Sequence, residues 1–131
     1  MLSRPLALAL RDAGLTWTPE NGDRFVVLDR DLDDLVFVLS DMVVEDVTLP
    51  DGSHVLAFNG TTEWALDALE ASEAVWLPSE GQLRGWLGQD FEALERLPGP
   101  GGGYAVTAAG QRHVDVSAPN AYARAVLALL G

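Results

Sequence analysis

The stretch that decides the fold class reads MVVEDVTLPDGSHVLAF over residues 42–58. Two runs rich in β-forming residues flank Pro50-Asp51-Gly52, a composition typical of a tight turn. This pattern predicts a β-hairpin. The run before it, LVFVLS at 35–40, is nearly all apolar, and such a run predicts a central strand that is buried on both faces.

N-terminal to the hairpin, the sequence predicts one helix and one strand. Ser3 is a natural N-cap, Pro5 fits the first helical turn, and Gly14 is a natural stop. The loop at 15–23 leads into a strand over 24–28. C-terminal to the hairpin, residues 61–70 have a helix-forming composition.

A further helix is predicted close behind a short strand at 74–77. Ser79-Glu80-Gly81-Gln82 fits the S-x-x-Q capping box, in which a serine and a glutamine side chain bond reciprocally to the backbone. The helix ends at Gly88. Its inner face is expected to carry Leu83, Trp86 and Leu87, which recur at helical spacing.

The last third of the chain predicts a hairpin and a closing helix. Residues 91–97 fit neither a strand nor a helix cleanly, so both remain open there. PGPGGG at 98–103 has the composition of a hairpin loop, with strands over 104–108 and 112–116. Ser117 begins the final helix.

The order of these elements predicts an α+β fold. The strands come in hairpins rather than alternating with helices, so we expect a mainly antiparallel sheet with about four helices packed on it. A length of 131 residues suits a single domain over 1–131. The chain lacks cysteine, which excludes disulfides, zinc–thiolate sites and a cysteine nucleophile.

The charge is strongly acidic. Eight arginines face 20 aspartates and glutamates, giving a formal net charge of −12, and 16 of the 20 acidic residues precede position 81. Nucleic acids and anionic membranes are themselves polyanions, so neither is expected as a partner. A cationic partner, a metal ion or simple solubility fits this charge better. Lysine and isoleucine are both absent, which is typical of a GC-rich genome.

The N-terminus indicates a cytoplasmic protein. A secretory signal needs an uninterrupted apolar region, but Pro5 comes early and Arg11-Asp12 follows after only a few apolar residues. The chain also has no apolar run of the roughly 18 residues that a membrane span needs.

Several stretches resemble known sequences. LALALRDAGLTWTPENGDRFVV at 6–27, WLPSEGQLRGWLG at 76–88, GGYAV at 102–106 and AYARAVLALLG at 121–131 resemble a family of small uncharacterised proteins from GC-rich bacteria, some of them labelled pilus assembly proteins. They are also similar to short phage-type hypothetical proteins. The shared motifs are a capped helix, a strand and an alanine-rich closing helix. The resemblance implies no established activity and transfers no functional residue.

Two groups of carboxylates are candidate metal sites. Asp29, Asp31, Asp33 and Asp34 alternate as in a calcium loop, but the glycine and glutamate of such a loop are missing, and a solvated acidic loop is the alternative. Glu63, Asp67 and Glu70 share one face of the predicted helix and could hold a divalent cation such as magnesium. An exposed acidic helix face is the alternative there.

The remaining candidates are two histidines and a tryptophan. His54 and His113 each have an aspartate nearby in sequence, which could form an acid–base pair, but ordinary strand histidines are favoured. Trp17 lies in a loop beside Pro19 and is the tryptophan expected to be most exposed. Because interfaces are enriched in tryptophan, it marks a candidate partner-binding surface.

These candidate residues leave three possible functions. The favoured one is a non-enzymatic interaction or regulatory module that binds a protein partner through Trp17, Asp29 and Asp31 within an acidic surface at 15–34. It needs no cofactor. The first alternative is a metal-dependent hydrolase acting on a phosphoester or nucleotide, which would use a divalent cation. The second is an acidic decoy that imitates nucleic acid. A homodimer through strand edges or the closing helix is also open.

Overall fold

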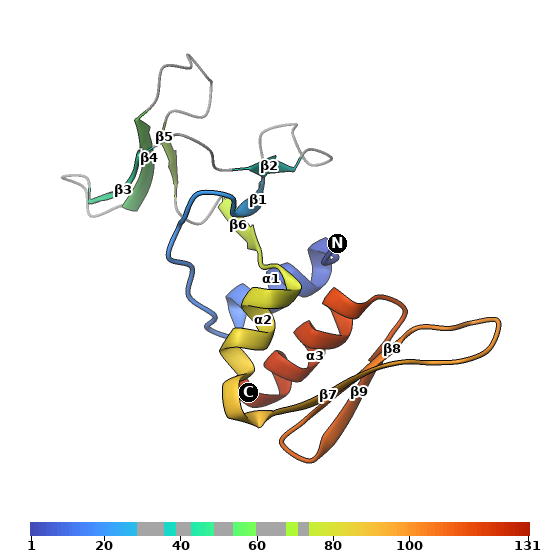
Figure 1. Ribbon diagram of the computed structural model, residues 1–131. Helices are drawn as coiled ribbons and strands as arrows, with labels where there is room; N and C mark the ends of the chain where they lie inside the picture. Colours follow the sequence, from blue (N-terminus) through green and yellow to red (C-terminus); the bar gives the residue numbers. More distant parts are fainter. Residues whose placement is uncertain (29–35, 39–42, 49–53, 60–67, 71–73) are drawn as a thin grey trace. The chain divides into compact units, whose positions relative to one another are not determined.

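A computed structural model describes residues 1–28, 36–38, 43–48, 54–59, 68–70 and 74–131 (Figure 1). It confirms an α+β fold. The elements, in chain order, are α1 (Arg4–Asp12), β1 (Arg24–Val27), β2 (Phe37–Val38), β3 (Val43–Thr48), β4 (His54–Asn59), β5 (Ala68–Glu70), β6 (Ala74–Leu77), α2 (Glu80–Leu87), the 3-10 turn η1 (Gly88–Asp90), β7 (Phe91–Arg96), β8 (Tyr104–Ala108), β9 (Gln111–Asp115) and α3 (Ala118–Leu130).

The described residues contain three α-helices, not about four. The difference lies in the helix predicted over 61–70. Residues 68–70 form strand β5, which pairs antiparallel with β4 so that Val55 lies opposite Glu70. The free edge of β4 satisfies the backbone groups of these residues, and this overrides their helical composition. Residues 61–67 lie outside the described part of the chain.

The chain divides into two compact units. Unit 1 joins Met1–Thr16 to Leu77–Gly131, and unit 2 is the continuous segment Trp17–Trp76. Unit 1 is therefore discontinuous in sequence. The 60 residues of unit 2 are inserted into it between α1 and α2. This division is finer than the single domain expected from chain length.

Helix α3 is the centre of unit 1. It packs against α1, α2, β8 and β9, as Figure 1 shows for the red C-terminal helix. Leu10, Leu83, Val106 and Val126 are the largest fully buried side chains of this core. Each fully buried side chain of this kind stabilises the fold by roughly 1.5–3 kcal/mol relative to an exposed one.

The predicted helix starts are confirmed. The Ser79 hydroxyl accepts from the Gln82 backbone N–H at 3.1 Å, and the Gln82 side chain accepts from the Ser79 N–H at 2.9 Å. Ser117 likewise accepts from the N–H of Asn120. Ser3 precedes α1 but makes no side-chain cap, and instead its N–H bonds to the Asn120 side chain at 2.9 Å.

The sheet of unit 1 has the order β7-β8-β9 and is antiparallel throughout. The sequence left strand and helix open for residues 91–97, and the structure shows strand β7 there. A bulge between Phe91 and Ala93 interrupts its alternation, and Glu92 is the extra residue. Its carboxylate accepts from the N–H of Gly110 at 2.7 Å, which ties the bulge to the β8–β9 turn.

Aromatic stacking joins this sheet to the helices. Phe91 stacks on Tyr122 of α3 with ring centroids 5.8 Å apart, and the Arg84 guanidinium lies 4.3 Å from the centre of the Phe91 ring. Burial raises the pKa of the Tyr122 phenol, although Arg84 acts in the opposite direction. The phenol therefore stays protonated in neutral solution.

Unit 2 contains the predicted hairpin. Strands β3 and β4 pair from Val43 opposite Asn59 to Thr48 opposite His54, and β5 adds a third strand. Strand β1 lies between β2 and β6 in the other sheet. The prediction of a central strand over 35–40 was wrong for its described residues, because β2 is an edge strand of two residues.

Candidate functional site

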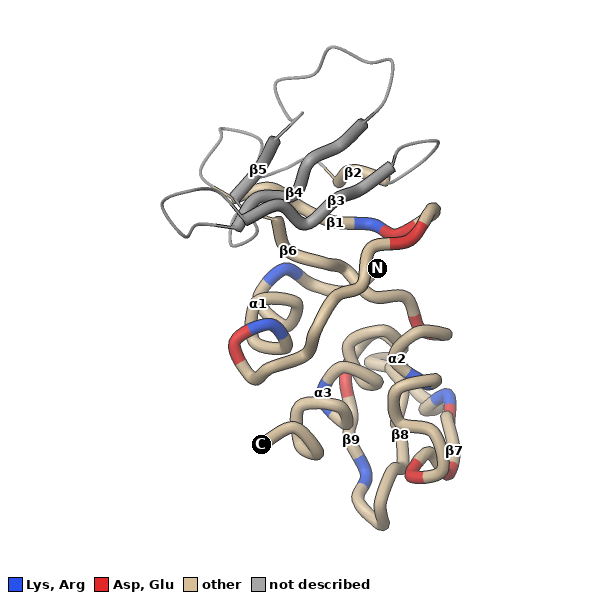
Figure 2. Tube along the Cα trace, turned by 90° about the vertical axis from the view of Figure 1, so that its left-hand side faces the viewer, with Lys and Arg blue, Asp and Glu red and all other residues tan. Residues whose placement is uncertain are grey.

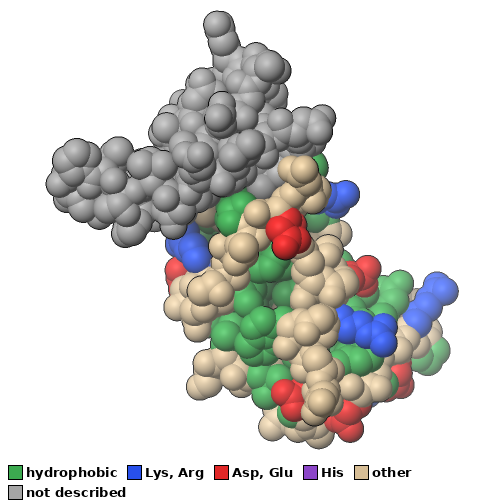
Figure 3. Space-filling model, turned by 60° about the vertical axis from the view of Figure 1, so that its left-hand side comes forward, with side chains coloured by type: hydrophobic (Ala, Val, Ile, Leu, Met, Phe, Trp, Pro, Cys, Tyr) green, Lys and Arg blue, Asp and Glu red, His purple; other side chains and the backbone are tan. Residues whose placement is uncertain are grey.

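The two units differ completely in charge. Unit 2 contains 14 acidic residues and two arginines, a formal net charge of −12, whereas unit 1 contains six of each sign and is formally neutral. In Figure 2 both signs occur along the helices and strands of unit 1. Figure 3 shows hydrophobic side chains at the surface of unit 1 with acidic and basic side chains around them. The whole net charge therefore belongs to unit 2.

An aromatic cluster lies within the described part of unit 2. The Trp17 and Trp76 rings are nearly parallel, at 8°, with centroids 6.4 Å apart. Trp17 also lies 5.7 Å from Phe25, which stacks on Phe37 at 5.6 Å. Such pairs contribute about 0.5–1.5 kcal/mol each beyond the area that they bury. Because Trp17 and Trp76 are the first and last residues of unit 2, this contact holds its two ends together.

A buried carboxylate fixes the loop that enters this cluster. Asp23 is 4% exposed, and its Oδ2 accepts from Trp17 Nε1 at 2.9 Å and from the Glu20 N–H at 3.0 Å. The Asp23 N–H in turn donates to the Glu20 carbonyl at 3.1 Å. Sequence reasoning found the Asn21-Gly22-Asp23 turn but missed this role, because one carboxylate among 20 carries no distinguishing pattern.

The structure changes the roles expected of the tryptophans. Trp17 is half-buried by its aromatic neighbours. Of the three tryptophans that the structure describes, Trp86 is the most exposed, at 42%, whereas Leu83 and Leu87 beside it are buried. The prediction that Trp86 shares their inner face was therefore wrong. Trp76 Nε1 is buried and has no hydrogen-bond partner within the described ranges.

Most of the predicted acidic sites lie outside the described residues. This holds for Asp29, Asp31, Asp33 and Asp34, and also for Glu63 and Asp67. Glu70 lies in strand β5, so the helical face proposed for the second metal site does not extend to it. In the described part of the chain, no three histidine, aspartate or glutamate side chains gather into a group that could hold a metal ion.

The two histidines fall in different units. His54 begins β4 in unit 2, and His113 lies in β9 opposite Val106 in unit 1. His113 forms no ion pair or hydrogen bond through its side chain to any residue that the structure describes. The nearby carboxylate of Asp115 is engaged elsewhere, so no acid–base pair forms between them.

Asp115 is a charged group of unit 1 that accepts several hydrogen bonds. Its Oδ2 accepts from Arg124 Nε at 2.7 Å, and its Oδ1 accepts from Asn120 Nδ2 at 3.3 Å and from the Ser117 N–H at 3.4 Å. Burial raises the pKa of this carboxyl, but the hydrogen bonds together hold it below its ordinary value of 3.8. Asp115 therefore joins the end of β9 to α3 as a structural anchor.

Within the described residues, no helix has both the length and the apolar character required to cross a membrane. Comparison with known proteins returned no matching family model, no matching curated protein and no matching solved structure. The family resemblance of the sequence therefore stays a prediction, and the function must be inferred from the chain itself.

Proposed function

We propose that the chain is a protein-interaction module whose unit 2 binds the basic surface of a partner protein. The observation that carries this proposal is the segregation of charge. All of the net charge of −12 lies in unit 2, whereas unit 1 is formally neutral. General selection for solubility would distribute the net negative charge over both units. Its confinement to one unit supports a specific role for the acidic residues of unit 2.

The aromatic cluster supports the same unit as the binding surface. Trp17 is only half-buried, and it is held in place by Trp76, Phe25 and the buried Asp23. A fixed tryptophan provides apolar contact area at little cost in side-chain entropy. The net negative charge of unit 2 would steer a basic partner toward this unit and raise the association rate.

Exposed ion pairs set the expected strength. Each is worth about 0.2–1 kcal/mol in dilute buffer, so a partner that pairs with four carboxylates gains roughly 1–4 kcal/mol. At 0.1 M salt, the attraction between exposed charges is largely screened when they are more than about 10 Å apart. The binding should therefore weaken steeply as the salt concentration rises.

The test compares two variants with the same total charge. The first carries Asp29→Asn, Asp31→Asn, Asp33→Asn and Asp34→Asn in unit 2. The second carries Asp12→Asn, Glu80→Gln, Asp90→Asn and Glu95→Gln in unit 1. Each loses four carboxylates. Fluorescence anisotropy with an arginine-rich peptide gives the dissociation constant, and a DNA duplex serves as a negative control.

The unit 2 variant should bind at least about tenfold more weakly, a loss of about 1.4 kcal/mol. The unit 1 variant should stay within about twofold of the parent chain, because its charges are balanced locally. Equal weakening of both variants would show that only the total charge matters and would overturn the proposal.

The hydrolase alternative concerns carboxylates outside the described residues. A thermal-shift series with calcium, magnesium, manganese and zinc tests it independently, because an ion at about 100 times its Kd adds about 2.7 kcal/mol to stability.

A further inference from the structure

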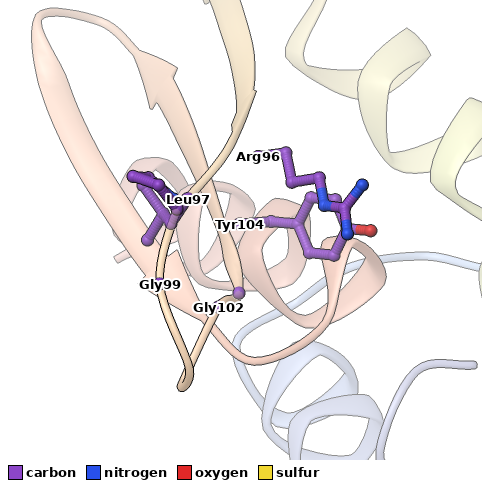
Figure 4. Close-up of a pocket in the computed structure, with 7 residues that line it drawn as sticks. Arg96, Leu97, Gly99, Gly102 and Tyr104 are labelled. Carbon is purple, nitrogen blue, oxygen red and sulfur yellow. The ribbon is translucent and has the colours of Figure 1, made fainter.

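The loop between β7 and β8 borders an open hollow of about 450 Å³ in unit 1 (Figure 4). Residues 97–99 line one side and residues 102–103 the other, with Arg96 and Tyr104 at the base. Its volume lies within the range of about 300–1,000 Å³ typical of small-molecule sites.

Backbone contacts fix the shape of this loop. The Leu97 N–H donates to the Gly103 carbonyl at 2.9 Å, and the Gly102 N–H donates to the Gly99 carbonyl at 3.1 Å. Gly103 has φ +101°, and a Cβ atom there would lie 2.8 Å from the Asp115 carbonyl oxygen. Only glycine fits this position, and the two hydrogen bonds join the arms of the loop.

Arg96 brings an uncompensated positive charge to the hollow. Arg112 pairs with Glu95 at 3.7 Å and Arg124 pairs with Asp115 at 2.7 Å, but Arg96 has no acidic partner among the residues that the structure describes. Glu95 is adjacent in sequence but points to the opposite face of the sheet, since side chains alternate along a strand.

Tyr104 places a hydroxyl beside this charge. It is the cross-strand partner of Arg96, and Figure 4 shows the two side chains extending side by side while Leu97 points away from them. Gly99 also lines the hollow, and its backbone N–H has no acceptor in the described part of the chain. The residues that line the hollow thus supply one positive charge, one hydroxyl and one unbonded backbone N–H.

We propose that this hollow binds a small oxyanion, a phosphate monoester or a carboxylate. The planar guanidinium of Arg96 matches the oxygen pair of either group, and the Tyr104 hydroxyl donates a further bond. Leu97 and Pro98 offer apolar contact to the organic part of the ligand. The site lies in the neutral unit and does not depend on the acidic interaction surface of unit 2.

The test is a titration of the full chain followed by two-dimensional ¹H–¹⁵N NMR. Phenyl phosphate, benzoate and inorganic phosphate are the probes, in about 150 mM salt, where the Debye length of about 8 Å screens the charge of unit 2. Saturable shifts are expected at the amides of the glycine loop. Tighter binding of phenyl phosphate identifies a phosphate monoester as the ligand, and tighter binding of benzoate identifies a carboxylate.

Arg112 provides the matched control, because it is an exposed arginine of the same sheet that already has a carboxylate partner. Arg96→Gln should weaken binding at least about tenfold, because a charge-assisted bidentate contact is lost. Tyr104→Phe should weaken it about threefold to tenfold, the effect of one neutral hydrogen bond. Arg112→Gln should leave the affinity within about twofold. An absence of saturable shifts, or equal losses in the two arginine variants, would overturn the proposal.

Discussion

Replacing Asp115 with asparagine tests whether the end of β9 is anchored to α3 as the structure indicates. The substitution keeps the size of the side chain and removes its charge. The lost interaction is the 2.7 Å bond from Arg124 Nε, because the bonds from Asn120 and Ser117 are long, at 3.3 and 3.4 Å. A charge-assisted bond is worth about 1.5–3 kcal/mol. Arg124 is half-exposed, and water replaces part of the interaction. We therefore expect a loss of about 1–2 kcal/mol in the free energy of unfolding of unit 1.

The effect should depend on pH in a defined direction. The pKa of Asp115 is lowered in the folded chain from its ordinary value of 3.8. A lowered pKa contributes stability that is fully present above the unfolded-state value and is lost as the pH falls through the folded-state value. The difference between the parent chain and Asp115→Asn should therefore be constant near neutral pH and shrink below pH 3.8.

The assay can follow each unit separately. Trp86 is the only tryptophan of unit 1, whereas Trp17, Trp64 and Trp76 belong to unit 2, and both tyrosines lie in unit 1. Urea unfolding observed by ¹⁹F NMR of 5-fluorotryptophan therefore resolves the two units. Arg124→Gln and the double variant complete a mutant cycle, with an expected coupling of about 1 kcal/mol. A coupling near zero, or a destabilisation that persists unchanged at low pH, would refute the anchoring role.

Two further predictions concern the backbone of unit 1. Ala109 has φ +51° in the two-residue β8–β9 turn. Ala109→Asn should stabilise unit 1 by about 0.5–1 kcal/mol, because asparagine tolerates this conformation better than alanine. Urea unfolding measures the gain, and a loss of stability would contradict the turn geometry. Replacing residues 17–76 with a short glycine–serine linker should leave unit 1 folded, since its largest buried side chains, such as Leu10, Leu83 and Val126, lie outside the replaced segment. Dispersed NMR signals from Trp86, Tyr104 and Tyr122 would confirm this, and collapsed signals would refute it.

Local sequence signals predicted the parts of the fold that depend on neighbouring residues. The capping box at Ser79 and Gln82 and the hairpin around Pro50-Asp51-Gly52 need only a few adjacent side chains, and both are confirmed through their helix and strands. The β7 pattern was ambiguous for a physical reason: the bulge at Glu92 adds one residue and shifts the alternation that marks a strand.

The signals failed where distant segments decide the outcome. Residues 68–70 have helical composition but pair with the edge of β4. Strand β2 is an edge strand in which Val38 is 53% exposed, and Val36 just before it is 41% exposed. The candidate sites likewise depend on segments that are distant in sequence. The pairing of Arg96 with Tyr104 depends on strand register across a loop, and the charge segregation becomes clear only once the unit boundaries at Trp17 and Trp76 are known.

The contact between Trp17 and Trp76 also bears on how the two units influence one another's stability. When unit 2 is unfolded, unit 1 must close a flexible loop of 60 residues between α1 and α2. When unit 2 is folded, the stacked rings hold the ends of that loop together, so it behaves as a connection of a few residues. Loop-closure entropy rises by about 0.6 kcal/mol per doubling of length, so the difference is about 2 kcal/mol. A partner that stabilises unit 2 would thereby stabilise unit 1 through chain entropy alone.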